Sequence, residues 1–114
     1  MSAITTHILD ISNGKPAADV MISLEWKDPS VGWQKIGDGL TNADGRISTL
    51  VPANVQFTPG HYRLIFETGA YFAGRGMECF YPQVMVAFTV RDISQHYHVP
   101  LLLSPFGYST YRGS

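Results

Sequence analysis

Apolar side chains recur at every second position in several stretches of the chain, which is the period of a β-strand with one buried face. Four stretches show this clearly, with Val, Ile, Leu or an aromatic residue at alternate positions: residues 20–26, 62–66, 84–90 and 97–103. Weaker patterns predict four more strands, at residues 4–11, 33–36, 46–50 and 108–112. The chain is therefore predicted to consist mainly of short strands.

Turn-forming residues separate these stretches and narrow the fold class. Asn13-Gly14, Asp28-Pro29 and Asp44-Gly45 are typical turn sequences. Only residues 69–76 are compatible with a helix, of about two turns. Eight short strands spaced by about 10 residues, with one short helix, predict an all-β protein built as an antiparallel sandwich. No internal repeat or change of composition marks a linker, so residues 1–114 are predicted to form a single domain.

Composition and charge narrow the function classes. Of the 114 residues, 45% are hydrophobic and 15% charged, a balance that supports a folded core and excludes a disordered chain. The formal net charge of −1 gives binding to nucleic acids or to an anionic membrane no electrostatic support. The single cysteine, Cys79, excludes an internal disulfide and favours a reducing compartment. With no apolar run near the roughly 20 residues of a membrane-spanning helix and no signal-peptide features, we expect a soluble cytoplasmic protein.

Two of the four histidines, His96 and His98, form a His-x-His pair in a predicted strand. On a strand both imidazoles lie on one face, opposite Tyr97 and Val99. If the apolar face packs into the core, both histidines point outward. Three interpretations remain: two solvated side chains, a zinc half-site that His7 completes, or an acid–base pair that exchanges protons near neutral pH. No ligand motif of recognised spacing favours the metal.

Three other polar residues are ambiguous when each is considered alone. His7 lies in the middle of the first predicted strand, Arg46 directly follows a tight turn, and His61 lies in another turn. Side chains at such positions commonly have structural or solvated roles. The last residues, 108–114, keep a strand-like pattern with two tyrosines and an arginine, which predicts that this end is docked rather than frayed.

Motifs along nearly the whole chain resemble those of one protein family. They are Thr6-His7-Ile8-Leu9-Asp10 with Gly14-Lys15-Pro16-Ala17, Thr41-Asn42-Ala43-Asp44-Gly45-Arg46, His96-Tyr97-His98-Val99-Pro100-Leu101, and Leu102-Leu103-Ser104-Pro105-Phe106-Gly107-Tyr108-Ser109-Thr110-Tyr111-Arg112-Gly113-Ser114. Together they resemble the 5-hydroxyisourate hydrolases, the transthyretin-like enzymes of urate breakdown. The last four residues, Tyr111-Arg112-Gly113-Ser114, are the most specific, and transthyretin itself, a hormone carrier, departs from this pattern.

The resemblance implies a transthyretin-like eight-stranded antiparallel sandwich with one short helix, assembled as a homotetramer that is a dimer of dimers. It also implies active sites in a channel between the dimers, 5-hydroxyisourate as substrate, and no metal or organic cofactor. The residues that match the family's catalytic positions are His7, Arg46 and His98. Those that match its substrate-binding positions are His7, Arg46, Tyr111 and Ser114.

The implied reaction hydrolyses the N1–C6 amide bond of 5-hydroxyisourate to 2-oxo-4-hydroxy-4-carboxy-5-ureidoimidazoline. Ring opening needs a base that activates water, a stabilised oxyanion and an acid for the leaving nitrogen. Two imidazoles can divide the proton transfers, and an arginine can hold developing negative charge. Two alternatives remain: a non-catalytic transthyretin-like carrier, and a zinc hydrolase that uses His7, His96 and His98.

Pro100 conflicts locally with the predicted strand that carries His98, because proline cannot donate a hydrogen bond to a strand ladder. Either its nitrogen points away from a partner strand, or the strand has a bulge there. The sequence leaves both possibilities open.

Overall fold

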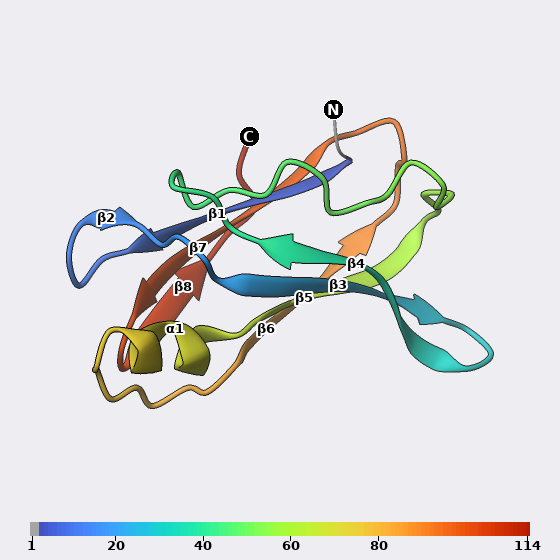
Figure 1. Ribbon diagram of the computed structural model, residues 1–114. Helices are drawn as coiled ribbons and strands as arrows, with labels where there is room; N and C mark the ends of the chain where they lie inside the picture. The colour runs from blue at the N-terminus through green and yellow to red at the C-terminus, as the bar shows by residue number, and fades with distance from the viewer. Residues whose placement is uncertain (1–2) are drawn as a thin grey trace.

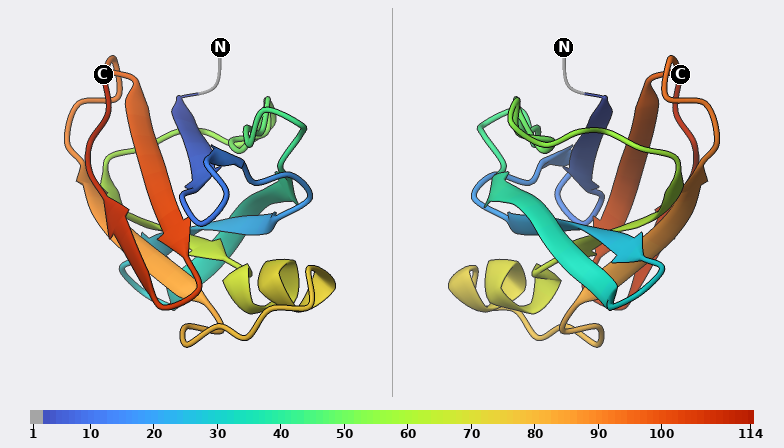
Figure 2. Two further views of the ribbon diagram at one scale, coloured as in Figure 1. Left: turned by 90° about the vertical axis from the view of Figure 1, so that its left-hand side faces the viewer. Right: turned by 90° about the vertical axis from the view of Figure 1, so that its right-hand side faces the viewer.

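Eight strands form two four-stranded sheets that pack face to face in a computed structural model, which describes residues 3–114 (Figure 1). The first sheet, in the order β2-β1-β7-β8, contains β1 (Ile4–Asp10), β2 (Lys15–Pro16), β7 (Tyr97–Ser104) and β8 (Gly107–Thr110). The second sheet, in the order β4-β3-β5-β6, contains β3 (Met21–Asp28), β4 (Gly32–Leu40), β5 (Gly60–Phe66) and β6 (Val84–Val90). The helix α1 (Thr68–Gly74) lies on the opposite side of the molecule from the C-terminus (Figure 2). No helix within the described residues is long and apolar enough to cross a membrane.

The predicted sandwich with one short helix is confirmed, but two details of the strands differ from the prediction. Residues 46–50 form no strand, and only Arg46 makes an isolated bridge, to His7. The segment instead crosses β4 so closely that a Cβ on Gly37 would lie 1.8 Å from the Leu50 carbonyl oxygen. Ile47 and Leu50 of this irregular segment are buried, and their spacing differs from the every-second-residue spacing of buried positions in a strand. The eighth strand is instead the short β2, which directly follows the predicted turn at Asn13-Gly14.

Neighbouring strands pair antiparallel with one exception, because β1 and β7 run parallel. Their register pairs Ile4 with Tyr97 and Asp10 with Leu103. A parallel pair cannot be joined by a hairpin, and here the whole second sheet lies between the two strands in sequence. This pairing brings the two ends of the chain into one sheet.

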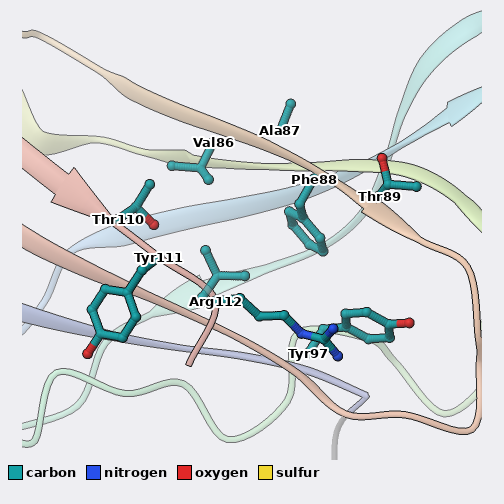
Figure 3. Close-up of a pocket in the computed structure, with 9 residues that line it drawn as sticks. Val86, Ala87, Phe88, Thr89, Tyr97, Thr110, Tyr111 and Arg112 are labelled. Atoms are coloured by element: carbon teal, nitrogen blue, oxygen red, sulfur yellow. The ribbon is translucent and has the colours of Figure 1, made fainter. Parts of the chain in front are cut away.

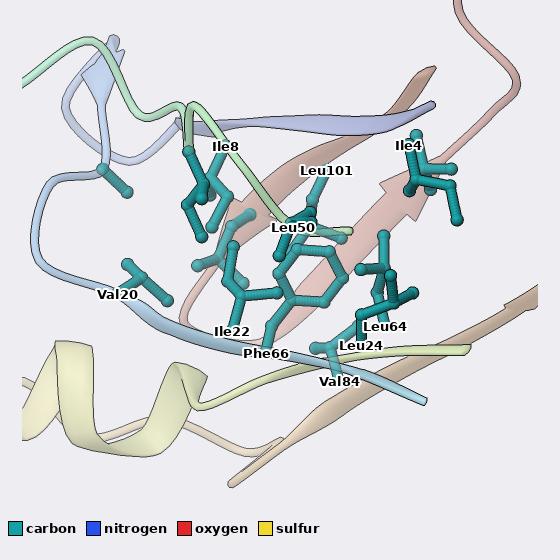
Figure 4. Close-up of a cluster of buried hydrophobic side chains, with 14 of the residues drawn as sticks. Ile4, Ile8, Val20, Ile22, Leu24, Leu50, Leu64, Phe66, Val84 and Leu101 are labelled. Atoms are coloured by element: carbon teal, nitrogen blue, oxygen red, sulfur yellow. The ribbon is translucent and has the colours of Figure 1, made fainter. Parts of the chain in front are cut away.

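Alternate residues of both sheets fill the core between them (Figure 4). The buried set includes Ile4, Ile8, Ile22, Leu24, Leu64, Phe66, Val84 and Leu101. Because Ile8 and Leu101 point inward, residues of the opposite parity on β1 and β7 point away from the core. His7 and His98 occupy such outward positions.

Pro100 lies where the pairing of β7 with β8 stops. The ladder ends with Leu101 opposite Thr110, and one further bridge joins His98 to Gly113 in the same register, so the strand has no bulge. The carbonyls of His98 and Pro100 both accept hydrogen bonds from the C-terminal segment, from the Gly113 N–H (2.8 Å) and the Thr110 hydroxyl (2.7 Å). The Pro100 nitrogen therefore faces the same segment, and its missing N–H interrupts the ladder after Thr110.

Asp10, a fully buried carboxylate at the end of β1, ties α1 to the first sheet. The Tyr71 hydroxyl donates to one carboxylate oxygen (2.7 Å), and the N–H and hydroxyl of Ser12 donate to the other. Burial raises the pKa of Asp10, but these hydrogen bonds outweigh burial and hold the pKa below its usual value. Burial and the hydrogen bond to Asp10 raise the pKa of Tyr71 to about 12. The hydrogen bond from Tyr71 to the charged Asp10 carboxylate thus anchors α1 to the first sheet, and α1 has no side-chain N-cap of its own.

Candidate active site

A polar hollow of about 570 Å³ lies on the outer face of the first sheet. All five residues that the sequence predicts for the site line it: His7, Arg46, His98, Tyr111 and Ser114. They come from β1, from the turn after β4, from β7 and from the C-terminal segment after β8. The structure therefore brings together residues that are far apart in the sequence.

Parallel pairing of β1 with β7 places the two catalytic candidates on neighbouring strands. Thr5 lies opposite His98, and His7 lies opposite Pro100. Both imidazoles project outward, since the residues that flank them on each strand are buried. Two histidines separated by most of the chain consequently share one hollow.

Arg46 is placed by the tight turn that precedes it. The Asn42 side-chain oxygen accepts hydrogen bonds from the N–H groups of Asp44 (2.9 Å) and Arg46 (3.1 Å). Gly45 has a φ of 73°, and its carbonyl accepts from the Ile8 N–H at 2.9 Å. A Cβ on Gly45 would lie 2.4 Å from the Ile8 carbonyl oxygen, so the turn can lie against β1 in this way only with glycine.

The surroundings of both candidate imidazoles favour their uncharged form. Burial lowers the pKa of His7, the Arg46 charge lowers it further, and a hydrogen bond to the Asp44 backbone carbonyl opposes these effects. Burial also lowers the pKa of His98, followed by the positive charge of Arg46 and the neighbouring His96 and His7. Each imidazole is therefore able to accept a proton from water at neutral pH.

Thr5 lies between two imidazoles, a position that the sequence pattern does not reveal. Its hydroxyl is 2.8 Å from Nδ1 of His98 and 2.9 Å from Nε2 of His96. The two ring centroids are 6.4 Å apart, so His96 is connected to His98 through Thr5. The one available signal is that Thr5 shares a strand face with His7, but this does not identify a partner 93 positions away.

The C-terminal segment is docked, as predicted, and Arg112 anchors it. Its guanidinium lies 4.6 Å from the Tyr97 ring centroid and donates to the Gln95 side chain at 2.9 Å. Figure 3 shows Arg112 against Tyr97, while Tyr111 points in a different direction. Arg112 therefore holds the segment in place, and Tyr111 is left to line the polar hollow.

Gly113 lets this segment approach the His98 ring closely. A Cβ on Gly113 would lie 2.6 Å from Cδ2 of the imidazole and 3.2 Å from Cγ of Pro100. The Gly113 N–H also donates to the His98 carbonyl at 2.8 Å. A larger residue would displace either the ring or the segment that carries Ser114.

Comparison with known proteins identifies the family. The family model described as the HIUase/Transthyretin family matches residues 4–113. The chain belongs to the HIUase/Transthyretin family. A curated relative, a probable 5-hydroxyisourate hydrolase from Caenorhabditis elegans, is 48% identical over 113 residues, which cover 99% of this chain and 82% of that protein.

Solved structures similar to this HIUase/Transthyretin family member carry two different names. The 5-hydroxyisourate hydrolase of Klebsiella pneumoniae is 40% identical with a TM-score of 0.83, over 97% of this chain and 92% of that one. Sea bream transthyretin, solved in complex with thyroxine, is 36% identical with a TM-score of 0.91, over 97% of this chain and 94% of that one. Because the backbone resembles both, the side chains in the hollow must distinguish the two functions.

A second hollow of this family member, about 230 Å³ in volume, lies between β6 and the C-terminal segment (Figure 3). Its lining includes Val86, Phe88 and Tyr97, and it contains no histidine and no carboxylate. His61 contributes to neither of these hollows, since it lies on the second sheet and hydrogen-bonds to the Thr89 hydroxyl at 3.1 Å. Of these two hollows, only the polar hollow contains imidazoles suited to proton transfer.

Within residues 3–114, no three His, Cys, Asp or Glu side chains are grouped closely enough to hold a metal ion. His7, His96 and His98 line one hollow, but Thr5 hydrogen-bonds to Nδ1 of His98 and to Nε2 of His96. The zinc alternative gains no support from this ligand geometry.

Proposed function

We propose that this protein hydrolyses the N1–C6 amide bond of 5-hydroxyisourate to 2-oxo-4-hydroxy-4-carboxy-5-ureidoimidazoline, a step of urate breakdown. One observation carries the proposal: the imidazoles of His7 and His98 share a hollow with the Arg46 guanidinium. Burial and the Arg46 charge lower the pKa of both imidazoles, which favours their proton-accepting form. The C. elegans and K. pneumoniae relatives are named for this activity. A base, an acid and a cation are the groups that opening of a cyclic amide requires.

The two imidazoles divide the proton transfers of this reaction. One takes a proton from water as the oxygen bonds to C6 of the substrate. The C6–N1 bond then breaks, and the leaving nitrogen receives a proton from the pair, so that one water is added overall. Arg46 stabilises the negative charge that develops on the C6 oxygen. His7, Arg46 and His98 are thus the proposed catalytic residues.

Substrate binding is assigned to His7, Arg46, Tyr111 and Ser114, which line the hollow together. Arg46 can hold substrate oxygens through its planar fork of donors. The Tyr111 side chain is 58% exposed, so its ring is free to contact a flat heterocycle. Ser114 adds a hydroxyl that can donate and accept hydrogen bonds.

A non-catalytic carrier is the second candidate, because the TM-score of 0.91 with sea bream transthyretin exceeds that with the K. pneumoniae hydrolase. The lining of the hollow argues against it. An apolar ligand would leave His7, Arg46 and His98 without polar partners, which is costly once water is displaced. A polar heterocycle would satisfy these groups.

We further propose that residues 1–114 form a single domain, and that four copies of the chain assemble in the cytoplasm as a homotetramer, a dimer of dimers. β6 and β8 are edge strands, with unpaired backbone groups that can pair with a second copy of the chain. Met85 on β6 and Tyr108 on β8 are 50% and 40% exposed, and pairing would cover them. Closed symmetric assembly is the usual outcome of such pairing, and the single Cys79 suits a reducing compartment.

The decisive experiment generates 5-hydroxyisourate from urate with a urate oxidase and follows its absorbance with and without this protein. We expect faster decay than the spontaneous reaction. Binding without acceleration would indicate the carrier, and no effect at all would contradict both candidates. We also expect activity to survive exhaustive chelation; loss with EDTA and recovery with zinc would establish the metal alternative.

A further inference from the structure

Thr5 and His96 line the hollow but have no role in the proposed hydrolysis as described above. The Thr5 hydroxyl connects Nδ1 of His98 to Nε2 of His96, at 2.8 Å and 2.9 Å. Thr5 is held at this place by the parallel register, which sets it opposite His98. The arrangement is therefore built into the pairing of β1 with β7 rather than made by a mobile loop.

A threonine hydroxyl has one proton, and this limits what the two rings can carry. With a ring nitrogen on each side, the Thr5 hydroxyl donates to one and accepts from the other. Hence only one of Nδ1 of His98 and Nε2 of His96 carries a hydrogen when both bonds are made. The protonation patterns of the two imidazoles are coupled through Thr5.

A second acceptor selects the direction of this coupling. The Thr5 backbone acts on the pKa of His98 in the direction of an acceptor, since it raises that pKa, and a carbonyl can only accept a hydrogen bond from the ring. With Nδ1–H of His98 directed at Thr5, the hydroxyl proton turns to Nε2 of His96. Nε2 of His98 then keeps its lone pair and can accept a proton.

We propose that Thr5 is a positioning residue which, supported by His96, holds His98 in the Nδ1–H tautomer and leaves Nε2 as the proton acceptor. This inference rests on the proposed hydrolysis and deepens it. When Nε2 takes a proton from water, the Nδ1–H of the imidazolium remains bonded to the Thr5 oxygen. The Thr5 hydroxyl remains bonded to His96, so neither hydrogen bond among His98, Thr5 and His96 has to transfer its proton.

The charges around His98 make this support important. His7 on β1, Arg46 in the turn after β4, His96 before β7 and Tyr111 in the C-terminal segment are the titratable or charged groups that share its hollow. The charge of Arg46 disfavours an imidazolium at His98. Hydrogen bonds accepted from the ring oppose that effect, because they stabilise its charged form.

The first test compares Thr5→Val with Thr5→Ser in the absorbance assay. Thr5→Val keeps the shape of the side chain but removes the hydroxyl that orients His98. We expect kcat to fall roughly 10- to 100-fold, the usual loss when a hydrogen-bond partner that orients a functional histidine is removed. KM should stay nearly unchanged. The acid limb of the pH profile should move to lower pH, because the imidazolium loses an acceptor. Thr5→Ser should restore both values.

A matched control removes the same kind of bond elsewhere. Thr89→Val deletes a hydroxyl bonded to His61 on the second sheet, and it should leave kcat and the pH profile unchanged. Adding His96→Phe to Thr5→Val should cause little further loss, since both residues act through one chain of hydrogen bonds. Additive losses would overturn the coupling of Thr5 to His96.

An independent test needs no variant and no activity. Nitrogen-15 NMR of the wild-type protein reports which nitrogen of neutral His98 carries the hydrogen. Nδ1–H is expected, and Nε2–H would overturn the inference even if Thr5→Val fails to fold. A wild-type protein that does not hydrolyse 5-hydroxyisourate contradicts the proposed function, whereas hydrolysis with an unaffected Thr5→Val contradicts the role of Thr5 alone.

Discussion

His7, Arg46 and His98 project from the first sheet into the hollow rather than into the core, so their replacement should affect catalysis far more than stability. We expect His7→Asn and His98→Asn each to lower kcat/KM by about 10²–10⁴, the usual cost of losing a general acid or base. Arg46→Ala should cost about 10²–10³, as for an oxyanion partner. The free energy of unfolding should change by no more than about 0.5 kcal/mol in urea titrations.

His61→Asn is the matched control for these variants, because His61 lies on the second sheet, hydrogen-bonds to Thr89 there, and lines neither the polar hollow nor the hollow beside β6. It should retain full activity. Equal losses in His61→Asn and His98→Asn, or a His98→Asn variant that unfolds, would show that the catalytic face is assigned wrongly.

The pH dependence of activity follows from burial and from the Arg46 charge, which together lower the pKa of His98 below the ordinary histidine value of 6.5. Activity requires the unprotonated ring, so it should persist below pH 6.5 and fall only as the pH passes through the lowered pKa. Arg46→Ala removes one cause and should move the acid limb of kcat/KM upward. A downward movement would contradict this account.

Stability should change in the same pH range. Because an unfolded histidine binds a proton near pH 6.5 and folded His98 does not, stability should decline as the pH falls from 6.5 towards the folded pKa.

At the scale of an element, the turn at residues 42–46 depends on Gly45, which has a φ of 73° and approaches the Ile8 carbonyl. Gly45→Ala should destabilise the protein by about 1–3 kcal/mol through backbone strain and should also lower activity, because the turn carries Arg46. Gly76→Ala is the control: its φ is 69°, but its Cβ would enter open space far from the hollow. It should lose some stability and no activity; equal activity losses would refute the role of the turn.

The attachment of α1 to β1 depends on the hydrogen bond from Tyr71 to buried Asp10. Tyr71→Phe should cost roughly 1.5–3 kcal/mol at pH 7, the range for a hydrogen bond to a charged group, with activity nearly intact. Tyr81→Phe, which removes the hydroxyl of a tyrosine that is 38% exposed, should cost nothing measurable.

Acidification tests the same contact. The folded pKa of Asp10 is lowered, so its stabilising effect is present above the unfolded pKa and is lost as the pH falls through the folded pKa. The difference between wild type and Tyr71→Phe in urea unfolding should therefore shrink towards low pH. A difference independent of pH would mean that the hydroxyl does not bond to the carboxylate.

At the scale of the whole molecule, the open hollow and two of the four edge strands, β6 and β8, make assembly testable. We expect light scattering at micromolar concentration to give about four times the chain mass of 12.6 kDa. Dilution that dissociates the assembly should lower the activity per chain, because the hollow would open to water. A stable, fully active monomer would contradict the proposed tetramer.

The sequence by itself determined the features that depend on neighbours along the chain. The period of two located all strands except β2, and the parity of Tyr97 and Val99 placed His98 on the outward face, as the structure confirms. The Asp44-Gly45 turn was likewise evident, because its conformation depends on residues within a few positions.

Only the tertiary structure decided the parallel register of β1 with β7, and with it the place of Thr5 beside His98. No local preference encodes this pairing, because the two strands are 93 positions apart at this contact and are aligned by packing both sheets around one core. The same packing turned residues 46–50 into an irregular segment that buries Leu50 against β4. The lowered pKa values of His7 and His98 also depend on burial and on the Arg46 charge, which exist only once these distant segments have met.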